Sequence, residues 1–535
     1  MSFFKRVFTL VISIFLSLSL LAQFAELTEL GEQRVSKSQF RVEGEAYEIK
    51  YIDTKFEVKN STGIVGVCNF SNKKDKIRYR DVVKLNNEFI FIFSTEKWSK
   101  LRVDYEFYAI KFDQLGEMVS DQAQMLFKSQ IFKSDWRVEY GELYDEYSAP
   151  EKMTISVFPN IKKSTIDIIY PKLEEETGKY SYQYISIDNH LELKVNATIY
   201  SDISRSVQKN TIFRITKPCY SKSGVVYFSQ YFNLKAKEKE RLGTEHSSFV
   251  ELSILKGDRF EKVLVGLEDN IILACEIKVF GNQVFFGGKV KKSGKKNKSQ
   301  SYLLGYYNLE SKESEFSTLE LTQMDFTAFM SSEDREEVIK TYLKKDKELP
   351  VGYAFRGFFV NDSGLYLSFQ RLVRTGELVN YETISVAKFN DIFDVEPKMS
   401  FLPFKTEKEC YNCVYSYLEK QPVDIIQFLG VGALYTIYYQ SDSNAKKQFS
   451  KNTVAKASSS SGGNSLYLAK MEPGEEYETM VIGKTSAFKS FNEVFMNYDS
   501  ISQVFCVAED DRYNDNEDKS NCSYDAKFFK FLFFD

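Results

Sequence analysis

The sequence is poor in the residues that most enzyme active sites use. It has two histidines, His190 and His246, and it lacks HExxH and GxSxG motifs, a Walker A loop, and a GxGxxG that follows a strand. A histidine-based triad or a multi-histidine metal centre therefore has too few residues. Both histidines lie in polar, turn-like stretches, so we expect them to be exposed loop residues. The sequence predicts no catalytic residue, no cofactor and no metal site.

Proline (9) and tryptophan (2) are also scarce among the 535 residues, whereas phenylalanine (46) and tyrosine (34) are abundant. The chain is 43% hydrophobic and 15% aromatic. This composition argues against disorder and favours extensive β-structure, in which aromatic residues are enriched.

The N-terminus resembles a secretory signal peptide. Lys5 and Arg6 precede an uncharged run over residues 7–21, and Ala22 offers a small residue for cleavage. The run is shorter than the roughly 20 residues that a membrane-spanning helix needs. We therefore predict a signal peptide over residues 1–22 and a secreted, periplasmic or cell-envelope protein, with an uncleaved anchor as the alternative. No later segment is apolar for long enough to span a membrane as a helix.

Charged residues nearly balance, with 71 basic and 75 acidic residues and a net charge of -4. This balance offers no general attraction to a phosphate backbone, so we expect no nucleic-acid partner. A basic run over residues 289–298 is interpreted as a solvated hairpin loop, with contact to a polyanion or an acidic surface as the alternative. An acidic loop over residues 509–518 is interpreted as solvated, with a weak cation site as the alternative.

Cysteine usage permits disulfides but does not define a framework. Cys410 and Cys413 form a CxxC without the βαβ context of a redox motif, so a local disulfide, inert thiols, or a redox or metal role stay open. Cys506 and Cys522 flank a loop between two strands and could staple it. Cys275 lies in an apolar run and is expected in the core. The odd total leaves at least one thiol unpaired; the cysteines are Cys68, Cys219, Cys275, Cys410, Cys413, Cys506 and Cys522.

Residues 353–390 show the clearest structural pattern. In residues 365–370, apolar and polar side chains alternate with a period of two, which is the signature of a strand. The Asn-Asp-Ser-Gly sequence at 361–364 is typical of a tight turn after an apolar first strand at 357–360. A polar loop and a third strand at 383–389 follow. The stretch therefore predicts an antiparallel meander.

Seven copies of this unit follow one another along the chain, with first strands beginning near residues 81, 154, 212, 272, 353, 426 and 492. Six units continue into a fourth strand, but the seventh ends after its third strand, at residues 528–534. A strand from the N-terminus, either 47–58 or 63–70, could complete it and so hide both sheet edges. In this rhythm the chain resembles β-propeller proteins as a class. The resemblance implies an all-β fold: a single propeller of seven four-stranded blades, closed by an N-terminal strand.

The predicted organisation is a signal peptide (1–22), an N-terminal segment with the closing strand (23–79) and the propeller (80–535). A helix is expected near residues 325–350, where Ser332 can cap a run with an apolar stripe, either packed on a blade edge or forming a lid. Residues 442–464 are expected to form a polar loop between strands. The alternative fold is a separate β-sandwich over residues 23–150 with a smaller propeller after it.

Regular strands with irregular loops and no assembled catalytic set favour a non-enzymatic binding protein whose partner is a protein or a glycan. The rival hypothesis is an extracellular hydrolase, with glycans as candidate substrates, that uses carboxylates at the central channel. A structural component of the cell envelope is a third hypothesis. The sequence identifies neither the ligand nor the oligomeric state.

Overall fold

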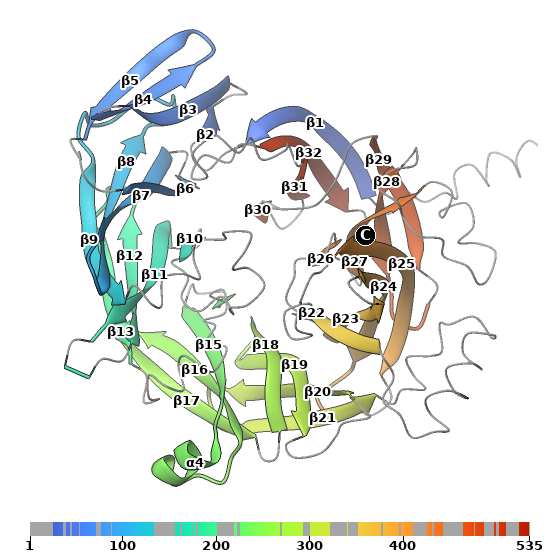
Figure 1. The fold of residues 1–535 in the computed structure, drawn as a ribbon. Helices are drawn as coiled ribbons and strands as arrows, with labels where there is room; N and C mark the ends of the chain where they lie inside the picture. The colour runs from blue at the N-terminus through green and yellow to red at the C-terminus, as the bar shows by residue number, and fades with distance from the viewer. Residues whose placement is uncertain are drawn as a thin grey trace, which may run out of the picture.

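In the computed structural model, the described residues are 25–132, 156–200, 219–321, 340, 351–409, 425–441, 464–485, 497–498, 502–509 and 524–533, with short gaps inside these ranges. They form eight four-stranded antiparallel sheets, which we number I to VIII (Figure 1). In seven sheets, strands that follow one another in the sequence pair, so each of these sheets is a meander; the eighth combines three consecutive strands with the first strand of the chain. This is the all-β repeat that the strand rhythm predicts.

The strands of the first four sheets have the following bounds. Sheet I contains β2 (Gln39–Val42), β3 (Glu45–Ile52), β4 (Lys55–Asn60) and β5 (Gly63–Asn69). Sheet II contains β6 (Lys76–Leu85), β7 (Glu88–Trp98), β8 (Arg102–Phe112) and β9 (Gln124–Phe132). Sheet III contains β10 (Ser156–Asn160), β11 (Thr165–Leu173), β12 (Tyr180–Asp188) and β13 (Leu193–Ile199). Sheet IV contains β14 (Cys219–Tyr220), β15 (Val226–Asn233), β16 (Ser248–Lys256) and β17 (Arg259–Leu267).

The remaining four sheets follow in chain order. Sheet V contains β18 (Asn270–Phe280), β19 (Gln283–Lys292), β20 (Gln300–Asn308) and β21 (Ser314–Leu321). Sheet VI contains β22 (Val351–Asn361), β23 (Gly364–Thr375), β24 (Leu378–Phe389) and β25 (Lys398–Glu409). Sheet VII contains β26 (Ile425–Leu429), β27 (Leu434–Ser441), β28 (Asn464–Met471) and β29 (Glu478–Thr485). Sheet VIII contains β30 (Asn497–Tyr498), β31 (Ser502–Glu509), β32 (Tyr524–Phe533) and β1 (Ala25–Val35).

The sheets stand around a common centre in chain order, with the first strand of each sheet on the inside (Figure 1). A separate apolar core fills each space from sheet I to sheet VII. Phe56 and Phe93 meet between sheets I and II, for example, and Tyr302 stacks on Phe369 between sheets V and VI. The other four cores lie between sheets II and III, III and IV, IV and V, and VI and VII. Radial sheets packed face to face define a β-propeller.

The ring is closed by the N-terminal strand β1, which pairs antiparallel with β32 from Ala25–Phe533 to Val35–Tyr524. A closing N-terminal strand is therefore confirmed, but its predicted position at 47–58 or 63–70 is wrong. Those residues form β3, β4 and β5 of sheet I instead. Short turns join them, so local pairing costs less chain entropy than pairing with the distant C-terminus.

The seven predicted repeats are all present as sheets II to VIII, and sheet I adds an eighth that the sequence did not predict. The alternative β-sandwich over residues 23–150 is wrong for the described part of that range. Sheet II forms the C-terminal part of that range, and it packs on sheet III through a shared core that includes Phe107 and Tyr170. Sheet II is therefore one member of the ring.

Sheet I differs from sheets II to VI, each of which contributes to two described cores, because its two faces are unlike. Tyr47, Ile49, Phe56 and Val58 pack on sheet II. The alternate residues of the same strands carry charges and form ion pairs on the opposite face: Glu48–Lys50 (3.2 Å), Lys55–Glu57 (3.0 Å) and Lys59–Glu57 (3.0 Å). Its outermost strand β5 exposes Ile64 and Val65, at 55% and 46% of their surface.

The predicted turn of sheet VI is present, with Asn361 paired to Gly364. The Asn361 side-chain oxygen accepts the Ser363 backbone N–H (2.9 Å), and Gly364 has a φ of 142°, which favours glycine. The basic run at 289–298 is not wholly a loop, because Lys289 to Lys292 belong to β19 and Lys289 is buried.

Three predicted segments lie outside the described residues: the signal peptide, the loop at 442–464 apart from residue 464, which begins β28, and the helix at 325–350 apart from residue 340. A short helix that was not predicted, α4 (Ala236–Leu242), lies between β15 and β16. The described residues contain no helix that is both long and apolar enough to cross a membrane.

Candidate functional site

The candidate site begins at a β-bulge in β6, on the inside of the ring. Tyr79 pairs with Phe93 and Asp81 pairs with Ile92, which leaves Arg80 as the extra residue. A bulge redirects a side chain and is common next to functional sites. Here it places Arg80 and Arg78 near each other on the innermost strand of sheet II.

These two arginines share one buried carboxylate. The Arg78 Nε donates to Glu96 Oε1 (3.2 Å), and a terminal nitrogen of Arg80 lies 3.9 Å from the same oxygen. Arg80 also donates from Nε to the hydroxyl of the buried Ser94 (2.9 Å), and its guanidinium lies over the Phe107 ring. Glu96 is only 1% exposed, so its charge is poorly solvated and its arginine partners fix it in place.

An exposed tryptophan completes this cluster. The Trp98 indole N–H donates to the other oxygen of Glu96 (3.4 Å), and the side chain is 42% exposed. Arg78, Arg80, Glu96 and Trp98 together form what we call the arginine site of sheet II. Two guanidinium groups against one carboxylate leave a net positive charge beside an aromatic face. Guanidinium forks match carboxylate, sulfate and phosphate groups, so the cluster is suited to an acidic ligand.

Sheet VI repeats part of this arrangement. Phe355 pairs with Phe369 and Gly357 with Ser368, so Arg356 is again the extra residue of a bulge on the innermost strand. Its Nε donates to the side-chain oxygen of the buried Gln370 (3.0 Å). Gln370 pairs across from Ala354, as Ser94 pairs across from Arg78, so Gln370 and Ser94 are equivalent positions.

The innermost strands as a group are basic, although the chain is acidic overall with a net charge of -4. Their described residues include two acids, Asp81 and Glu276. They include seven bases: Arg41, Lys76, Arg78, Arg80, Lys84, Lys278 and Arg356. Positive charge is therefore concentrated on the strands nearest the ring centre.

The two inner-strand acids are not placed together. Asp81 lies on sheet II and accepts the backbone N–H of Val82 (2.8 Å), whereas Glu276 lies on sheet V and accepts the backbone N–H of Phe358 (3.2 Å). Within the described part of the chain, no group of three or more His, Cys, Asp or Glu side chains could hold a metal ion. The inner strands thus supply arginines more readily than the carboxylate pair of the hydrolase hypothesis.

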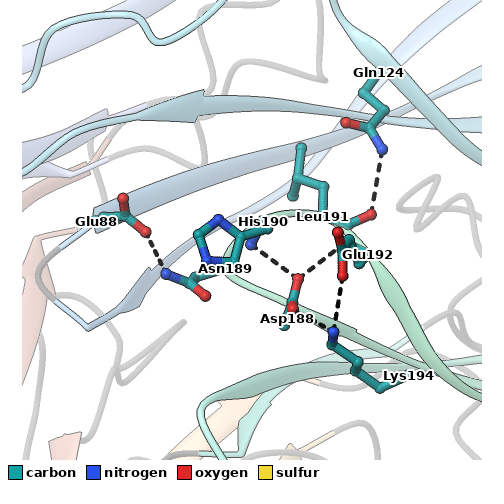
Figure 2. Close-up of polar contacts among 8 residues, drawn as sticks. All are labelled: Glu88, Gln124, Asp188, Asn189, His190, Leu191, Glu192 and Lys194. Carbon is teal, nitrogen blue, oxygen red and sulfur yellow. Dashed lines mark hydrogen bonds and ion pairs between the residues drawn. The ribbon is translucent and has the colours of Figure 1, made fainter.

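His190 is an exposed turn residue, as the sequence predicts (Figure 2). Its backbone N–H donates to Asp188 Oδ1 (2.9 Å), and the same oxygen accepts the N–H of Glu192 (2.9 Å). Asn189 in this turn donates to Glu88 of sheet II (2.8 Å). The turn therefore joins sheet III to sheet II.

His246 is only partly exposed, so its predicted full exposure is wrong. Its ring packs edge-on against Phe249 and lies over Gly266, where even a Cβ would come within 2.4 Å of the imidazole. The space above Gly266 is what allows the histidine to fold inward. His246 is thus part of the packing of sheet IV.

A second buried acid, Asp167, lies between sheets III and IV. It accepts hydrogen bonds from Ser186 (2.7 Å), Thr165 (3.1 Å) and Asn160 (3.2 Å), all buried with it. Burial raises the pKa of the neighbouring Tyr220, and the negative charge of Asp167 adds to that shift. The tyrosine therefore stays protonated, and the cluster is suited to holding two sheets together.

Three cysteines have described side chains, and all three are free thiols: Cys68, Cys219 and Cys275. Cys275 is buried, as predicted, and burial raises its pKa. Burial likewise raises the pKa of Cys68 and Cys219 to about 11, so none of the three is a reactive thiolate. The proposed disulfide residues Cys410, Cys413 and Cys522 lie outside the described residues, as does the side chain of Cys506.

The arginine site was missed because the predicted first strand of sheet II began at Asp81. Arg356 lies within the 353–390 pattern, but nothing in that pattern assigns it a role. A usable signal exists in the sequence: Arg80 and Arg356 each lie five residues before the last paired residue of their hairpin, Leu85 and Asn361. Aligning the repeats on their hairpins superimposes the two arginines.

The chain is thus a β-propeller with a basic interior. No protein-family model matches it, and no curated protein is significantly similar in sequence. Among solved structures, the polysaccharide lyase Uly1 is 11% identical over 95% of this chain and 99% of its own length, with a TM-score of 0.41. The WD40 domain of SCAP from fission yeast is 7% identical over 96% and 98%, with a TM-score of 0.33. Neither similarity is high enough to transfer an activity to this chain.

Proposed function

We propose that this protein is a secreted β-propeller that binds an acidic ligand, such as a carboxylated or sulfated glycan, at the arginine site of sheet II. The observation that carries this proposal is the pairing of two arginines with a single buried glutamate beside an exposed tryptophan. The arginines supply charge and directed N–H donors. The indole offers a flat apolar surface that can stack on a sugar ring.

The excess of basic residues on the inner strands supports the same ligand class. A positive surface surrounded by an acidic protein attracts an anion toward one region and repels it elsewhere. Glu96 has a positioning role, because its two oxygens engage Arg78 and Trp98 at once. Each candidate contact therefore depends on a rigid, buried anchor.

The test is binding of the mature protein to chondroitin sulfate and polygalacturonate, with dextran as the neutral polymer, measured by calorimetry at low and high salt. We expect binding to at least one acidic polymer, weakened by salt, and none to dextran. Arg80→Gln should weaken binding about 10- to 100-fold, the usual effect of losing a charged hydrogen bond. The matched control is Arg259→Gln, because Arg259 is 90% exposed on the outermost strand of sheet IV.

Equal affinity of Arg80→Gln and Arg259→Gln, or equal binding to dextran, would contradict the proposal. The same samples should be assayed for new reducing or unsaturated chain ends, because their release would favour an enzyme over a binding protein. Trp98→Ala should weaken binding to the glycans without changing the salt dependence, since the indole carries no charge.

The secreted location rests on Lys5, Arg6 and the uncharged run that follows them. We expect the mature protein to begin at Gln23, which N-terminal sequencing of the exported protein can check. Retention of residues 1–22 would instead support a membrane anchor.

A further inference from the structure

Arg80 and Arg356 occupy equivalent positions on two different sheets. Each is the extra residue of an inner-strand bulge, each lies five residues before the end of its hairpin strand, and each donates from Nε to a buried side chain of the second strand. Inner strands run in the same direction in every sheet of a propeller. The two arginines therefore lie at the same depth along the ring axis.

Their sheets face each other across the ring. The sheets follow in chain order from I to VIII, so sheets II and VI are four places apart in a ring of eight (Figure 1). Both arginines also lie on the side of their sheet that faces the next one. Phe107, which Arg80 covers, belongs to the core between sheets II and III, and its counterpart Ile384 belongs to the core between sheets VI and VII.

Both side chains are held in place by their Nε bonds. An Nε bond to a buried acceptor fixes the plane of the guanidinium, so its remaining donors have a defined direction. The acceptors differ, a hydroxyl at Ser94 and an amide oxygen at Gln370, yet the bond is the same. The same arrangement is thus present in two sheets that use different acceptor residues.

We propose that Arg80 and Arg356 are two anchoring points for one ligand, which is an extended polyanion with acid groups along its length and not a compact monovalent anion. This inference rests on the proposed function of the arginine site and specifies its ligand. A chain that reaches across the ring engages the second arginine at a high effective concentration, whereas a short anion engages only one.

The experiment uses chondroitin sulfate oligosaccharides of increasing length, from the disaccharide upward, with the mature protein. We expect weak binding of short oligosaccharides and a step in affinity, about 10²- to 10⁴-fold, once the chain spans both arginines. Arg80→Gln and Arg356→Gln should each abolish the step and leave short-chain binding at the other arginine. The double variant should lose both, and Arg259→Gln should retain the step.

The outcomes separate this inference from the proposed function. Binding without a length step, or a step that survives Arg356→Gln, overturns the two-point inference and leaves an acidic ligand at sheet II intact. Absence of binding to both chondroitin sulfate and polygalacturonate at any length overturns the proposed function and this inference with it. The length series is measured on the wild-type protein. It therefore still tests the two-point inference if one of the arginine variants fails to fold. Arg80→Lys and Arg356→Lys, which keep the charge but lose the fork, should retain a smaller step.

Discussion

Sheets I and VI have the same four-strand meander but bury different amounts of their surface. Sheet VI is covered on both faces, by Phe369 and Phe358 toward sheet V and by Tyr366 and Ile384 toward sheet VII. Sheet I buries one face against sheet II and carries lysine–glutamate pairs on the other. A sheet with one apolar face has about half the hydrophobic stabilisation of a sheet with two.

The outermost strands of the two sheets also differ in how well they are protected against pairing with another strand. The outermost strand of sheet VI, β25, contains three lysines and two glutamates, which discourage pairing with another strand. The outermost strand of sheet I, β5, contains no charged residue. Sheet I is therefore the sheet that we expect to open first and to protect its edge least.

The largest expected effect is in sheet VI. Phe369→Ala removes a fully buried ring that stacks on Tyr302 (4.9 Å between centroids) and should lower the free energy of unfolding by about 3–5 kcal/mol. Lys50→Ala, on the charged face of sheet I, should change it by less than about 0.5 kcal/mol. Denaturant midpoints measure both. Similar losses from the two variants would mean that the charged face is buried by something else in solution.

The next expected effect is a difference in thiol labelling. Cys68 lies in the core between sheets I and II, and Cys275 lies in the core between sheets IV and V. Both thiols are buried and have a raised pKa, so an alkylating reagent at neutral pH should reach them only after local opening. We expect Cys68 to be labelled much faster than Cys275, as followed by peptide mass spectrometry.

The control for this comparison is the unfolded protein, in which the two thiols should react at similar rates. Equal rates in the native protein would indicate that sheet I opens only when the whole ring opens. A sheet with one apolar face would then open no more readily than a sheet with two.

The smallest expected effect concerns the charged face itself. Hydrogen bonds from Lys55 and Lys59 lower the pKa of Glu57 below its usual 4.5. A lowered carboxyl pKa stabilises the folded state above pH 4.5, and this contribution is lost as the pH falls through the lowered value. Glu57→Gln should therefore flatten the acid side of the stability profile slightly. High salt should reduce the difference, because both lysines are exposed. An unchanged profile would show that these pairs contribute nothing to stability.

The repeats were predictable because apolar strands recur between turn signals, and several of these strands are buried on both faces, as β7 and β16 are. Strands β3 and β4 of sheet I instead alternate apolar and charged residues, from Tyr47 to Ile49 and from Phe56 to Val58. What the pattern could not show was their partner: a strand with one apolar face fits either a closing strand or a sheet of its own. Only the pairing of β1 with β32 decides between these two.

The arginine site was hidden by its own geometry. A bulge inserts one residue and so shifts the period of two. In sheet II the predicted strand starts at Asp81, just after the bulge, so Arg80 was left outside it. In sheet VI the predicted strand starts near residue 353 and contains Arg356, but the sequence does not show that this residue is the extra one of a bulge. Aligning the two hairpins shows in the sequence that Arg80 and Arg356 lie at the same distance from the hairpin turn.

The pairing of β1 with β32 also sets the order in which the molecule can be completed. Residues 25–35 are made before every other described strand, whereas their partner strand, residues 524–533, is the last described strand to be made. Until β32 has been made, β1 has no strand with which to pair. Contacts between such distant residues form late and slowly. Assembly of this propeller thus ends with the pairing of its first and last described strands, and a truncated product from which the last strands are missing would leave β1 unpaired.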